Sequence, residues 1–435
     1  MKAVIMAGGK GTRLLSLTNN EIPKPMVEVL GKPILLWQIE RLKEYGITDI
    51  MLVVGHLKEK IIGFFKDGKA YGVNISYFEE SKPLGSAGSL YYLKDFLNSE
   101  DFLLVFGDVM FDIDINRMYN YHKEKNSFIT LFAHPNMHPF DSDLLVTDNE
   151  NRVLKIDSKH NIRNYWYKNL VNAGFYIMNG KICDYVKEDT KTDLEKDLIP
   201  AAMKENNAYV YRSTEYIKDV GTVERIELAT KEINNGLISN RCLKTKQKAI
   251  FMDRDGTLNK YNGLIYKEEQ FELEDCAIEA IRLINGSGYL GIIITNQPVV
   301  ARGLCDIEDV ENIHNKMETL LGKEGVYLDD VFYCPHHPDK GYPEENPLYK
   351  IKCHCRKPDT GMIEEAVNKY NIDLKESWFI GDTTMDIQTG KNAGLKTILV
   401  KTGIAGQDGK YDAKADYICD NLEEAVKLII GEKHE

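Results

Sequence analysis

Residues 2–9 read KAVIMAGG and residues 248–257 read KAIFMDRDGT. Each stretch opens with a short apolar run, typical of a buried parallel strand, and ends in glycines or aspartates. After each stretch, segments with helical spacing alternate with further apolar runs. This alternation predicts an α/β fold with two domains, each a mostly parallel sheet with helices on both faces. The expected strands are 2–6, 50–54, 103–106, 248–252, 290–295, 378–380 and 397–400, and the expected helices are 34–42, 223–234 and 277–284.

The boundary between the two predicted domains follows the closing helix at 223–234. Gly236 is a typical helix stop, and residues 237–247 are polar and basic with no clear period. We therefore expect the 435 residues to divide into a first domain at 1–236, a linker at 237–247 and a second domain at 248–435.

The composition limits the classes of function. Lys and Arg number 55 and Asp and Glu number 67, which gives a formal net charge of −12. That sign disfavours sequence-independent binding to nucleic acid or to anionic membranes. No apolar run approaches the roughly 18–20 residues of a membrane span, and the first residues are too short for a signal sequence. A cytoplasmic chain with small-molecule substrates is expected, and a homo-oligomer stays open.

The loop after the first strand has the residue types of a phosphate site. Gly8, Gly9 and Gly11 allow backbone N–H groups to approach a phosphate closely. Arg13 adds a bidentate phosphate partner, and Lys24, between two prolines, adds a point charge. A tight strand-to-helix turn would use the same glycines, so this loop alone is weak evidence.

Two aspartates farther along the chain are candidate ligands of a hard cation. Asp108 follows the strand at 103–106, and Asp219 lies in KDVGT at 218–222. Taken singly, each is equally well explained as a loop cap. Together they predict a shared Mg²⁺ site, because this cation prefers carboxylate oxygens and substrate phosphates.

These motifs, in this order, resemble those of the sugar-1-phosphate nucleotidylyltransferases over about residues 1–236. The resemblance rests on GGKGTR at 8–13, PKPM at 23–26, GKP at 31–33, PLGSAG at 83–88, GD at 107–108 and DVGT at 219–222. It implies a Rossmann-like domain in which a sugar 1-phosphate attacks the α-phosphate of a nucleoside triphosphate and pyrophosphate leaves. The residues that it implies for nucleotide binding are Gly8, Gly9, Gly11, Thr12, Arg13, Lys24 and Gly85, with Arg13 and Lys24 catalytic; Asp108 and Asp219 would hold Mg²⁺, and Asn172 and Gly174 would contact the sugar.

Three further residues of this half are assigned through the same resemblance. Lys159 stands near the place where the family often has a Glu-Lys pair for the sugar and its phosphate, and Glu195 resembles a sugar-contacting glutamate. Glu80 lies in the stretch that recognises the base. A carboxylate can accept both the N1–H and the exocyclic amine of guanine, which favours GTP, although relatives that use other bases also carry a glutamate there.

Two carboxylates follow the second quoted strand. Asp253 and Asp255 are two residues apart, so on an extended segment both can point to one site. One can attack phosphorus while the other, kept protonated, gives its proton to the leaving group, and Mg²⁺ would relieve their repulsion. The spacing of a calcium-binding EF-hand loop is absent.

DRDGT at 253–257, Thr295, Lys357 and GDTTMD at 381–386 resemble, in this order, the haloacid-dehalogenase-like phosphatases over about residues 247–430. The resemblance implies a Rossmannoid domain with Asp253 as the nucleophile and Asp255 as the general acid and base. The residues implied for the phosphoryl group are Thr295, Asn296 and Lys357, and those for Mg²⁺ are Asp253, Asp255 and Asp382, with Asp386 acting from behind them.

Cysteines and histidines in two short motifs predict a structural zinc site. Cys334 and His336 form one pair, and Cys353 and Cys355 form the other. Three thiolates and one imidazole make a closed tetrahedral set with no open position for a reactive water. His337 and His354 are the competing imidazoles.

This loop resembles that of the D-glycero-D-manno-heptose-1,7-bisphosphate 7-phosphatases and of the histidinol-phosphate phosphatases. Arg302 and Arg356 are then candidates for the second phosphate of the substrate. Since histidinol is not activated with nucleotides, the fusion to a transferase favours heptose. The resemblance thus implies a bifunctional enzyme that dephosphorylates heptose 1,7-bisphosphate and makes GDP-heptose.

Two alternatives remain at this point. One is a mannose or glucose 1-phosphate nucleotidylyltransferase joined to a phosphatase for another phosphorylated sugar. The other is a nucleotide-sugar sensor whose transferase half is inactive, against which the presence of Arg13, Lys24, Asp108 and Asp219 argues.

Overall fold

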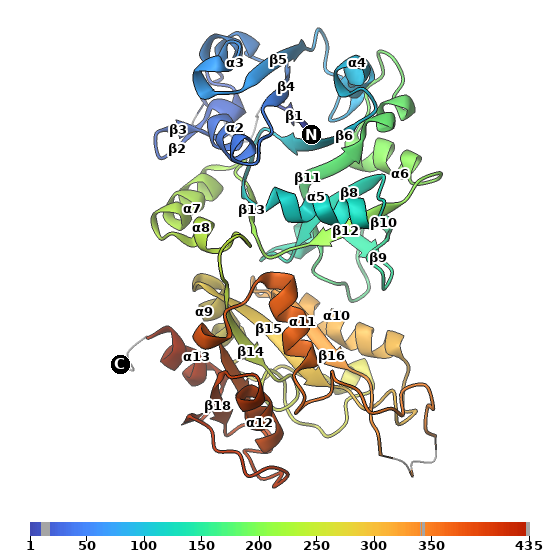
Figure 1. Ribbon diagram of the computed structural model, residues 1–435, viewed down its shortest axis with the longest axis vertical. Helices are drawn as coiled ribbons and strands as arrows, with labels where there is room; N and C mark the ends of the chain where they lie inside the picture. Colours follow the sequence, from blue (N-terminus) through green and yellow to red (C-terminus); the bar gives the residue numbers. More distant parts are fainter. Residues whose placement is uncertain (10–17, 340, 342–343, 432–435) are drawn as a thin grey trace. The chain divides into compact units, whose positions relative to one another are not determined.

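The computed structural model describes residues 1–9, 18–339, 341 and 344–431, which form two compact units (Figure 1). Unit 1 comprises Met1–His134, Asp143–Ser158 and Val171–Cys242. Unit 2 comprises Leu243–Glu435 together with two segments from earlier in the chain, Pro135–Ser142 and Lys159–Leu170.

Unit 1 is built on a nine-stranded sheet whose central strands are parallel. Its main path runs β10-β9-β11-β6-β1-β4-β5, and β8 pairs with both β11 and β12. The strands β11 and β6 are antiparallel, so this sheet is mixed. The strand bounds are β1 (Lys2–Met6), β4 (Asp49–Val54), β5 (Asn74–Glu79), β6 (Asp101–Phe106), β8 (Ile129–His134), β9 (Leu144–Thr147), β10 (Val153–Asp157), β11 (Val171–Asn179) and β12 (Ala208–Arg212).

Two short antiparallel ribbons and several helices complete unit 1. One ribbon pairs β2 (Glu28–Val29) with β3 (Lys32–Pro33), and the other pairs β7 (Val109–Asp112) with β13 (Tyr216–Asp219). The helices are α2 (Ile34–Glu44), α3 (Lys58–Phe65), α4 (Lys94–Leu97), α5 (Ile115–Glu124), α6 (Ile199–Ala202), α7 (Val223–Asn234) and α8 (Leu237–Asn240).

Unit 2 has a six-stranded, fully parallel sheet in the order β16-β15-β14-β17-β18-β19. Alternate residues of its central strand β14 enter different apolar cores. Ile250 and Met252 join residues of α9 and α13, whereas Ala249 and Phe251 join residues of α11. The elements are β14 (Lys248–Met252), β15 (Tyr289–Asn296), β16 (Asp330–Cys334), β17 (Trp378–Gly381), β18 (Lys396–Val400), β19 (Tyr417–Cys419), α9 (Ala277–Gly286), α10 (Ile307–Lys323), α11 (Gly361–Tyr370), α12 (Thr384–Asn392) and α13 (Leu422–Ile430).

The predicted α/β class is confirmed, and each expected strand and helix is present within one or two residues at its ends. Residues 237–240 of the predicted linker form the short helix α8, and the change from unit 1 to unit 2 falls within the linker, between Cys242 and Leu243. None of the helices in the described ranges has the length and apolarity that crossing a bilayer requires.

The segment Lys159–Leu170 is fixed to helix α10 by hydrogen bonds between its backbone and side chains of the helix. The Tyr167 N–H donates to Thr319 Oγ1 at 2.9 Å, and the Thr319 hydroxyl donates to the Tyr167 carbonyl at 3.1 Å. The Asn169 N–H donates to the Glu318 carboxylate. Tyr167, Asn169 and Thr319 are all buried, so in the folded chain these polar groups bond one another instead of water.

The segment Pro135–Ser142 is bonded to the segment Lys159–Leu170 through Arg163 and through a pair of hydrogen bonds between Asn136 and Asn169. Arg163 donates to the carbonyls of Pro139 and Ser142 at 2.8 and 2.7 Å. The ring of Trp166 lies under two ammonium groups of α10, those of Lys316 and Lys323, at 5.7 and 5.5 Å from the ring centre. Both segments are thus structural parts of unit 2, although the chain enters them from strands of unit 1.

Replacing Thr319 with Val should destabilise unit 2 by about 1–3 kcal/mol, because the backbone N–H and carbonyl of Tyr167 would stay buried without their partner. Denaturant unfolding of the full chain, followed by a probe in unit 2, measures this. The matched control is Thr360→Val, at an exposed hydroxyl that bonds only the Glu364 side chain, which should change stability by less than about 0.5 kcal/mol. Equal effects of the two substitutions would contradict the structural role of the segment.

Candidate active sites and metal centres

In unit 1, two of the predicted metal ligands lie at neighbouring ends of the β7–β13 ribbon. Asp219 pairs with Val109, and the Val220 N–H donates to the carbonyl of Asp108 at 2.9 Å. The ammonium of Lys24 forms an ion pair with Asp108 and lies 3.8 Å from Asp219 Oδ1. The structure therefore brings Lys24, Asp108 and Asp219 together, with a cationic group already in contact with both carboxylates.

Arg225 is a member of this cluster that the sequence analysis missed. Its guanidinium donates to Asp219 Oδ2 at 2.7 Å from the first turn of α7, where Thr222 is the N-cap. The signal in the sequence is the Thr-x-x-Arg start of a helix directly after Asp219. Three predicted residues of the phosphate loop, Gly11, Thr12 and Arg13, lie outside the described residues.

Glu80 lies against the start of the phosphate loop. A Cβ on Gly8 would come 2.7 Å from Glu80 Oε2, so only glycine admits the carboxylate at this distance. The other oxygen of Glu80 accepts the Leu84 N–H at 3.3 Å, and burial raises the pKa of this carboxyl. Gly9 is next along the loop, and Gly85 packs against the backbone of Thr192.

The candidate sugar contacts Asn172 and Glu195 are linked through Tyr176, which the sequence analysis did not single out. Asn172 Nδ2 donates to the Tyr176 hydroxyl at 2.8 Å, and that hydroxyl donates to Glu195 Oε1 at 2.9 Å. Burial raises the pKa of Glu195 to about 7. The Oδ1 atom of Asn172 is buried and has no hydrogen-bond partner among the residues that the structure describes, so it is an acceptor ready for a hydroxyl donor.

The two remaining residues of the predicted sugar site are placed differently. Gly174 lies on β11 with Asn172, two residues along the strand, and packs against the ring of Phe106. Lys159 is exposed and begins the segment Lys159–Leu170, which belongs to unit 2. The place of Lys159 in the sugar site stays a prediction.

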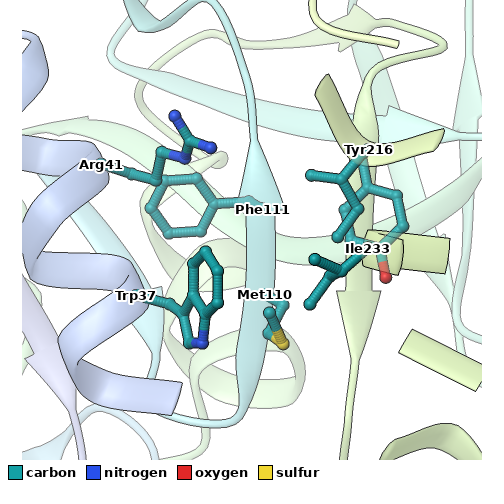
Figure 2. Close-up of a pocket in the computed structure, with 7 residues that line it drawn as sticks. Trp37, Arg41, Met110, Phe111, Tyr216 and Ile233 are labelled. Atoms are coloured by element: carbon teal, nitrogen blue, oxygen red, sulfur yellow. The ribbon is translucent and has the colours of Figure 1, made fainter. Parts of the chain in front are cut away.

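Figure 2 shows an apolar pocket of about 90 Å³ in unit 1, behind the β7–β13 ribbon. It is lined by Trp37 and Arg41 from α2, by Met110 and Phe111 from β7, and by Tyr216 from β13. None of the predicted site residues lines it, so this pocket is separate from the cluster of Lys24 with the two aspartates.

In unit 2, three aspartates converge at the carboxyl ends of β14 and β17. Carboxylate oxygens of Asp253, Asp382 and Asp386 all lie within 4.8 Å of one another. The buried ammonium of Lys357 lies 2.8 Å from Asp253 Oδ1 and 2.6 Å from Asp386 Oδ1. Burial, and then the neighbouring carboxylates, raise the pKa of Asp253 to about 7 and that of Asp382 to about 8.

The donor set around Asp382 fits a divalent cation. Its Oδ2 accepts the Ile404 N–H at 2.7 Å, while its buried Oδ1 has no hydrogen-bond partner in the part of the chain that the structure describes. A Cβ on Gly256, whose φ is +84°, would come 2.4 Å from this carboxylate. The backbone is therefore kept clear for a close approach of carboxylate oxygens, which are the ligands that Mg²⁺ prefers.

The carboxylate of Asp255 is not among these mutually close oxygens, and its place in the Mg²⁺ ligand set stays a prediction. It accepts hydrogen bonds from Arg254, Asn259 and Gln297. Asp386, expected to act from behind, supplies the third carboxylate instead.

The predicted phosphoryl contacts lie around Lys357. Thr295 is buried, and its hydroxyl accepts the Gln297 amide at 2.9 Å. The Asn296 side chain accepts the Lys357 N–H at 3.0 Å and donates to the Lys357 carbonyl at 3.2 Å. Asn296 therefore holds the backbone of Lys357 in place, and both the oxygen and the nitrogen of its side-chain amide take part in these hydrogen bonds.

The guanidinium groups of Arg302 and Arg356 are close enough to affect each other. Arg356 donates to the carbonyl of His336 at 3.0 Å, and burial followed by the charge of Arg302 lowers the pKa of Arg356. Two partly buried guanidinium groups next to each other favour a doubly charged anion such as a phosphate.

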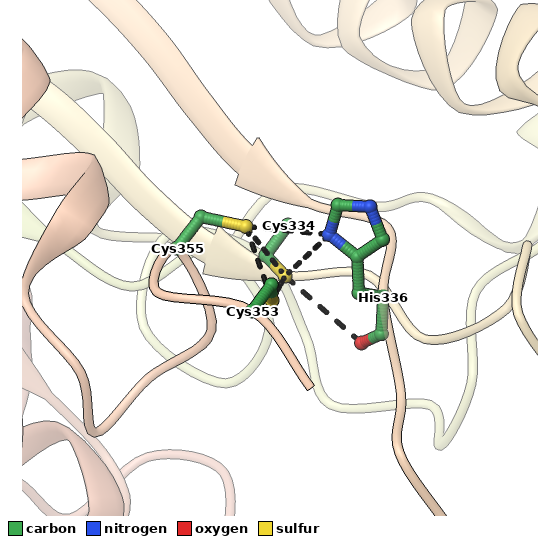
Figure 3. Close-up of side chains that lie close together, drawn as sticks. All are labelled: Cys334, His336, Cys353 and Cys355. Atoms are coloured by element: carbon green, nitrogen blue, oxygen red, sulfur yellow. Dashed lines mark hydrogen bonds between the residues drawn. The ribbon is translucent and has the colours of Figure 1, made fainter. Parts of the chain in front are cut away.

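Figure 3 shows the third cluster, which consists of Cys334, His336, Cys353 and Cys355. The three Sγ–Sγ distances are 3.2, 3.3 and 3.5 Å, and His336 Nδ1 lies 3.3 Å from Cys355 and 3.7 Å from Cys334. Tetrahedral zinc with its usual bond lengths separates two sulfurs by about 3.8 Å and a sulfur from a nitrogen by about 3.6 Å, so the four atoms are gathered slightly more tightly than around the ion but in the arrangement that it requires.

Two further observations support a metal at these cysteines. Hydrogen bonding with Cys334, and then with His336 and Cys353, lowers the pKa of the Cys355 thiol to about 5, whereas the pKa values of Cys334 and Cys353 are raised, so one thiolate of the three is favoured before a metal binds. The competing imidazoles are engaged elsewhere, since His354 bonds Glu364 at 2.9 Å and His337 Nδ1 accepts the Asp339 N–H at 3.2 Å.

With this geometry in view, we compared the chain with known proteins. Residues 2–236 match the nucleotidyl transferase family, and residues 354–425 match the HAD-hydrolase-like family. A D-glycero-beta-D-manno-heptose-1,7-bisphosphate 7-phosphatase of Pasteurella multocida is 40% identical over 190 residues, which are 43% of this chain and 99% of that protein.

The first half has relatives of its own. A UTP–glucose-1-phosphate uridylyltransferase of Synechocystis is 33% identical over 213 residues, which are 46% of this chain but only 54% of that protein. The crystal structure of HddC from Yersinia pseudotuberculosis complexed with GMP-PN is 25% identical, covers 53% of this chain and 99% of its own, and has a TM-score of 0.46.

The chain therefore belongs to the nucleotidyl transferase family, and its C-terminal part belongs to the haloacid-dehalogenase-like phosphatases. It is a fusion of two enzymes, a nucleotidyltransferase and a phosphatase, as the two sets of sequence motifs predicted.

Binding of Mg²⁺ to unit 2 should release protons, because carboxyls with pKa values of about 7 and 8 are partly protonated at neutral pH and must ionise to bind a cation. We expect about one to two protons per cation near pH 6.5 and almost none at pH 9.5. Calorimetric titration in buffers of different ionisation enthalpy measures this number.

The titration is made on a chain that carries Asp108→Asn, which weakens the first site. Adding Asp382→Asn should remove most of the proton release, whereas Asp416→Asn, at an aspartate outside the cluster, should leave it unchanged. Proton release that does not depend on pH would show that these carboxyls are already ionised without the cation.

Proposed function

We propose that this chain carries out two steps in the activation of a heptose. Unit 2 removes the 7-phosphate of D-glycero-D-manno-heptose 1,7-bisphosphate, and unit 1 transfers GMP from GTP to the resulting heptose 1-phosphate with release of pyrophosphate. The carrying observation is that one chain joins a phosphatase 40% identical to a heptose-bisphosphate phosphatase with a nucleotidyltransferase, which needs a sugar 1-phosphate.

In the phosphatase, Asp253 is the proposed nucleophile. Its carboxylate forms a bond to phosphorus while the bond to the C7 oxygen breaks, and Asp255 gives that oxygen a proton. A water then attacks the phosphorus, Asp255 takes its proton, and the bond to Asp253 breaks. Lys357, already 2.8 Å from Asp253, neutralises charge on the phosphoryl oxygens.

In the transferase, an oxygen of the sugar 1-phosphate attacks the α-phosphorus of GTP, and the bond to the β-phosphate oxygen breaks. No proton transfer is needed, so the work of the protein is positioning and neutralising charge. Lys24 and Arg13 would hold the triphosphate. The Asn172–Tyr176–Glu195 network would orient the sugar, with the unpartnered Oδ1 of Asn172 accepting a hydroxyl.

Guanine is the base that the site supports best. The Glu80 carboxylate lies beside Gly8 at the mouth of the phosphate loop, where it can accept the N1–H and the exocyclic amine of guanine together. Uracil and thymine offer a single ring N–H at the corresponding edge, so they would form one hydrogen bond with this carboxylate where guanine forms two.

Mg²⁺ is the proposed cation in both units, and zinc is the proposed structural ion. Asp253, Asp382 and Asp386 would hold one Mg²⁺, and Asp108 and Asp219 the other; the cation supplies neutralisation of charge that develops on phosphate oxygens. The four-residue set of Cys334, His336, Cys353 and Cys355 would hold zinc with all ligand positions filled.

The hexose alternative is supported by a specific relative, the uridylyltransferase that acts on glucose 1-phosphate. This chain spans only about half of that protein, whereas it covers 99% of the heptose-bisphosphate phosphatase, so heptose remains the first choice. A reaction of the purified chain with heptose, mannose and glucose 1-phosphates and with each nucleoside triphosphate, read by mass, decides between them.

Asp253→Asn should reduce phosphate release by about 10³-fold or more and leave nucleotidyl transfer intact, because an amide is a poor nucleophile and a weak cation ligand. Asp108→Asn should instead reduce nucleotidyl transfer and leave phosphate release intact. With heptose 1,7-bisphosphate and GTP as substrates, neither variant should make GDP-heptose. With heptose 1-phosphate and GTP, Asp253→Asn should make GDP-heptose and Asp108→Asn should not.

Phosphate, pyrophosphate and GDP-heptose are measured separately for both variants. The control is Asp416→Asn, which should retain both activities. Loss of transfer from heptose 1-phosphate in the Asp253→Asn variant would sink the assignment of two independent catalytic sites.

Removal of zinc should destabilise unit 2 without slowing the transferase, since a filled ligand set contributes folding free energy and no reactive water. Cys353→Ser or chelation should lower the Tm of unit 2 by about 10 °C or more, given that 1 kcal/mol moves the Tm of a unit of this size by about 2–4 °C. Calorimetry and metal analysis are the measurements, with Cys276→Ser as the control. A metal-free chain with unchanged thermal stability refutes the zinc site.

A further inference from the structure

Arg254, between the two aspartates of the phosphatase motif, has a side chain with no exposed surface. A guanidinium is almost never taken out of water unless its N–H groups are satisfied by specific partners. Its Nε donates to Asp255 Oδ1 at 3.0 Å and its NH2 donates to Asp255 Oδ2 at 2.9 Å. This two-pronged contact fixes the plane of the carboxyl group, which a single hydrogen bond would leave free to turn.

The other end of the guanidinium is held by His314 on α10. Arg254 NH1 lies 3.1 Å from His314 Nε2, and because arginine can only donate, this nitrogen of the imidazole must accept. His314 is buried, and its ring packs against Tyr333 with the ring centres 5.0 Å apart. The imidazole is therefore a fixed acceptor that sets the direction of the arginine fork.

Two amides complete the surroundings of the same carboxyl. Asn259 Nδ2 donates to Asp255 Oδ1 at 3.1 Å, and Gln297 Nε2 donates to Asp255 Oδ2 at 2.9 Å. Gln297 also donates to Thr295, a predicted contact of the phosphoryl group. The contacts of Asp255 thus extend through Gln297 to Thr295 and, on the other side, through Arg254 to His314.

We propose that Arg254, held by His314, is a positioning residue that aligns the Asp255 carboxyl for proton transfer in the phosphatase reaction. This inference rests on the acid and base role of Asp255 in the proposed function. The main-chain N–H of Arg254 donates to Asp253, but the guanidinium contacts Asp255 and not the nucleophile, so loss of the side chain should affect proton transfer more than nucleophilic attack.

The phosphatase reaction has two steps, formation of the aspartyl phosphate and its hydrolysis. Whether the first step needs a proton from Asp255 depends on the leaving group. An alkoxide, as at C7 of a sugar, needs the Asp255 proton when its bond to phosphorus breaks. A 4-nitrophenolate leaves without a proton, so formation of the aspartyl phosphate then depends little on Asp255. Hydrolysis of the aspartyl phosphate needs Asp255 as a base for water in both cases.

The test uses the full chain loaded with Mg²⁺ and zinc and compares Arg254→Met with the parent chain on heptose 1,7-bisphosphate and on 4-nitrophenyl phosphate. We expect kcat on the bisphosphate to fall about 100-fold, within the range of acid–base catalysis, with KM changed less than about threefold. With the aryl ester, the rapid-mixing trace should show a burst of nitrophenolate, with formation of the aspartyl phosphate slowed less than about tenfold.

A double-mutant cycle connects the effect to Asp255. Asp255→Asn alone should show the same dependence on the leaving group, and Arg254→Met added to it should cost less than about threefold more. If Asp255→Asn slows formation of the aspartyl phosphate equally from both substrates, the acid–base assignment itself fails. If Asp255→Asn is selective in this step but Arg254→Met slows it equally from both esters, the positioning role is wrong and Arg254 is merely structural.

Two variants of His314 test the same proposal if Arg254→Met does not fold. His314→Gln retains an acceptor for the guanidinium and should keep at least about a third of the activity, whereas His314→Leu removes it and should reproduce the selective loss on the bisphosphate. Equal activity of these two variants, or a faster reaction of either on the bisphosphate, would overturn the proposal.

Discussion

A single ammonium group among three buried carboxylates is the constraint on which unit 2 depends. Lys357 contacts Asp253 and Asp386, and Asp382 completes the set, in an interior where each isolated charge would be costly. One positive charge cannot offset three negative ones, which is why burial and repulsion raise the pKa values of Asp253 and Asp382. The excess of negative charge on these carboxylates favours binding of a divalent cation.

Unit 1 meets a related problem with less burial. Lys24 is shared between Asp108 and Asp219, whose side chains are 23% and 36% exposed, so water screens much of their charge. Arg225 adds a second cation on Asp219. An open site of this kind suits a transferase, because a triphosphate and a nucleotide sugar must enter and leave, whereas the clustered aspartates of the phosphatase are buried side chains that act on a single phosphoryl group.

Much of this architecture could be predicted from the sequence, because buried parallel strands leave short apolar runs, and their ends carry the polar residues. This is how the strands before Asp108, Asp253 and Asp382 were placed, and it is why those residues were found as candidates. Each of these features depends on local sequence alone, so no knowledge of the tertiary structure was needed.

The contributions that the sequence did not reveal come from contacts between distant residues. A buried arginine such as Arg254 looks like any charged residue until its partner His314, 60 positions away, is known. The same holds for Tyr176, an apolar-looking strand residue whose hydroxyl links two sugar contacts. The polar segment Lys159–Leu170 reads as a surface loop, and nothing local indicates that it packs on α10.

The proposed order of reactions places a demand on the phosphatase that its aspartate cluster cannot meet alone. Both phosphates of the bisphosphate are monoesters, and the anomeric one has the better leaving group, yet it must survive for the transferase. Discrimination therefore has to come from groups that bind the phosphate that is not attacked. Arg302 and Arg356 are suited to this, because the charge of Arg302 acts on Arg356, and Arg356 donates a hydrogen bond to the carbonyl of His336, a residue of the cysteine cluster. A structural metal that holds this loop would then contribute to the choice of phosphate without approaching the reacting atoms.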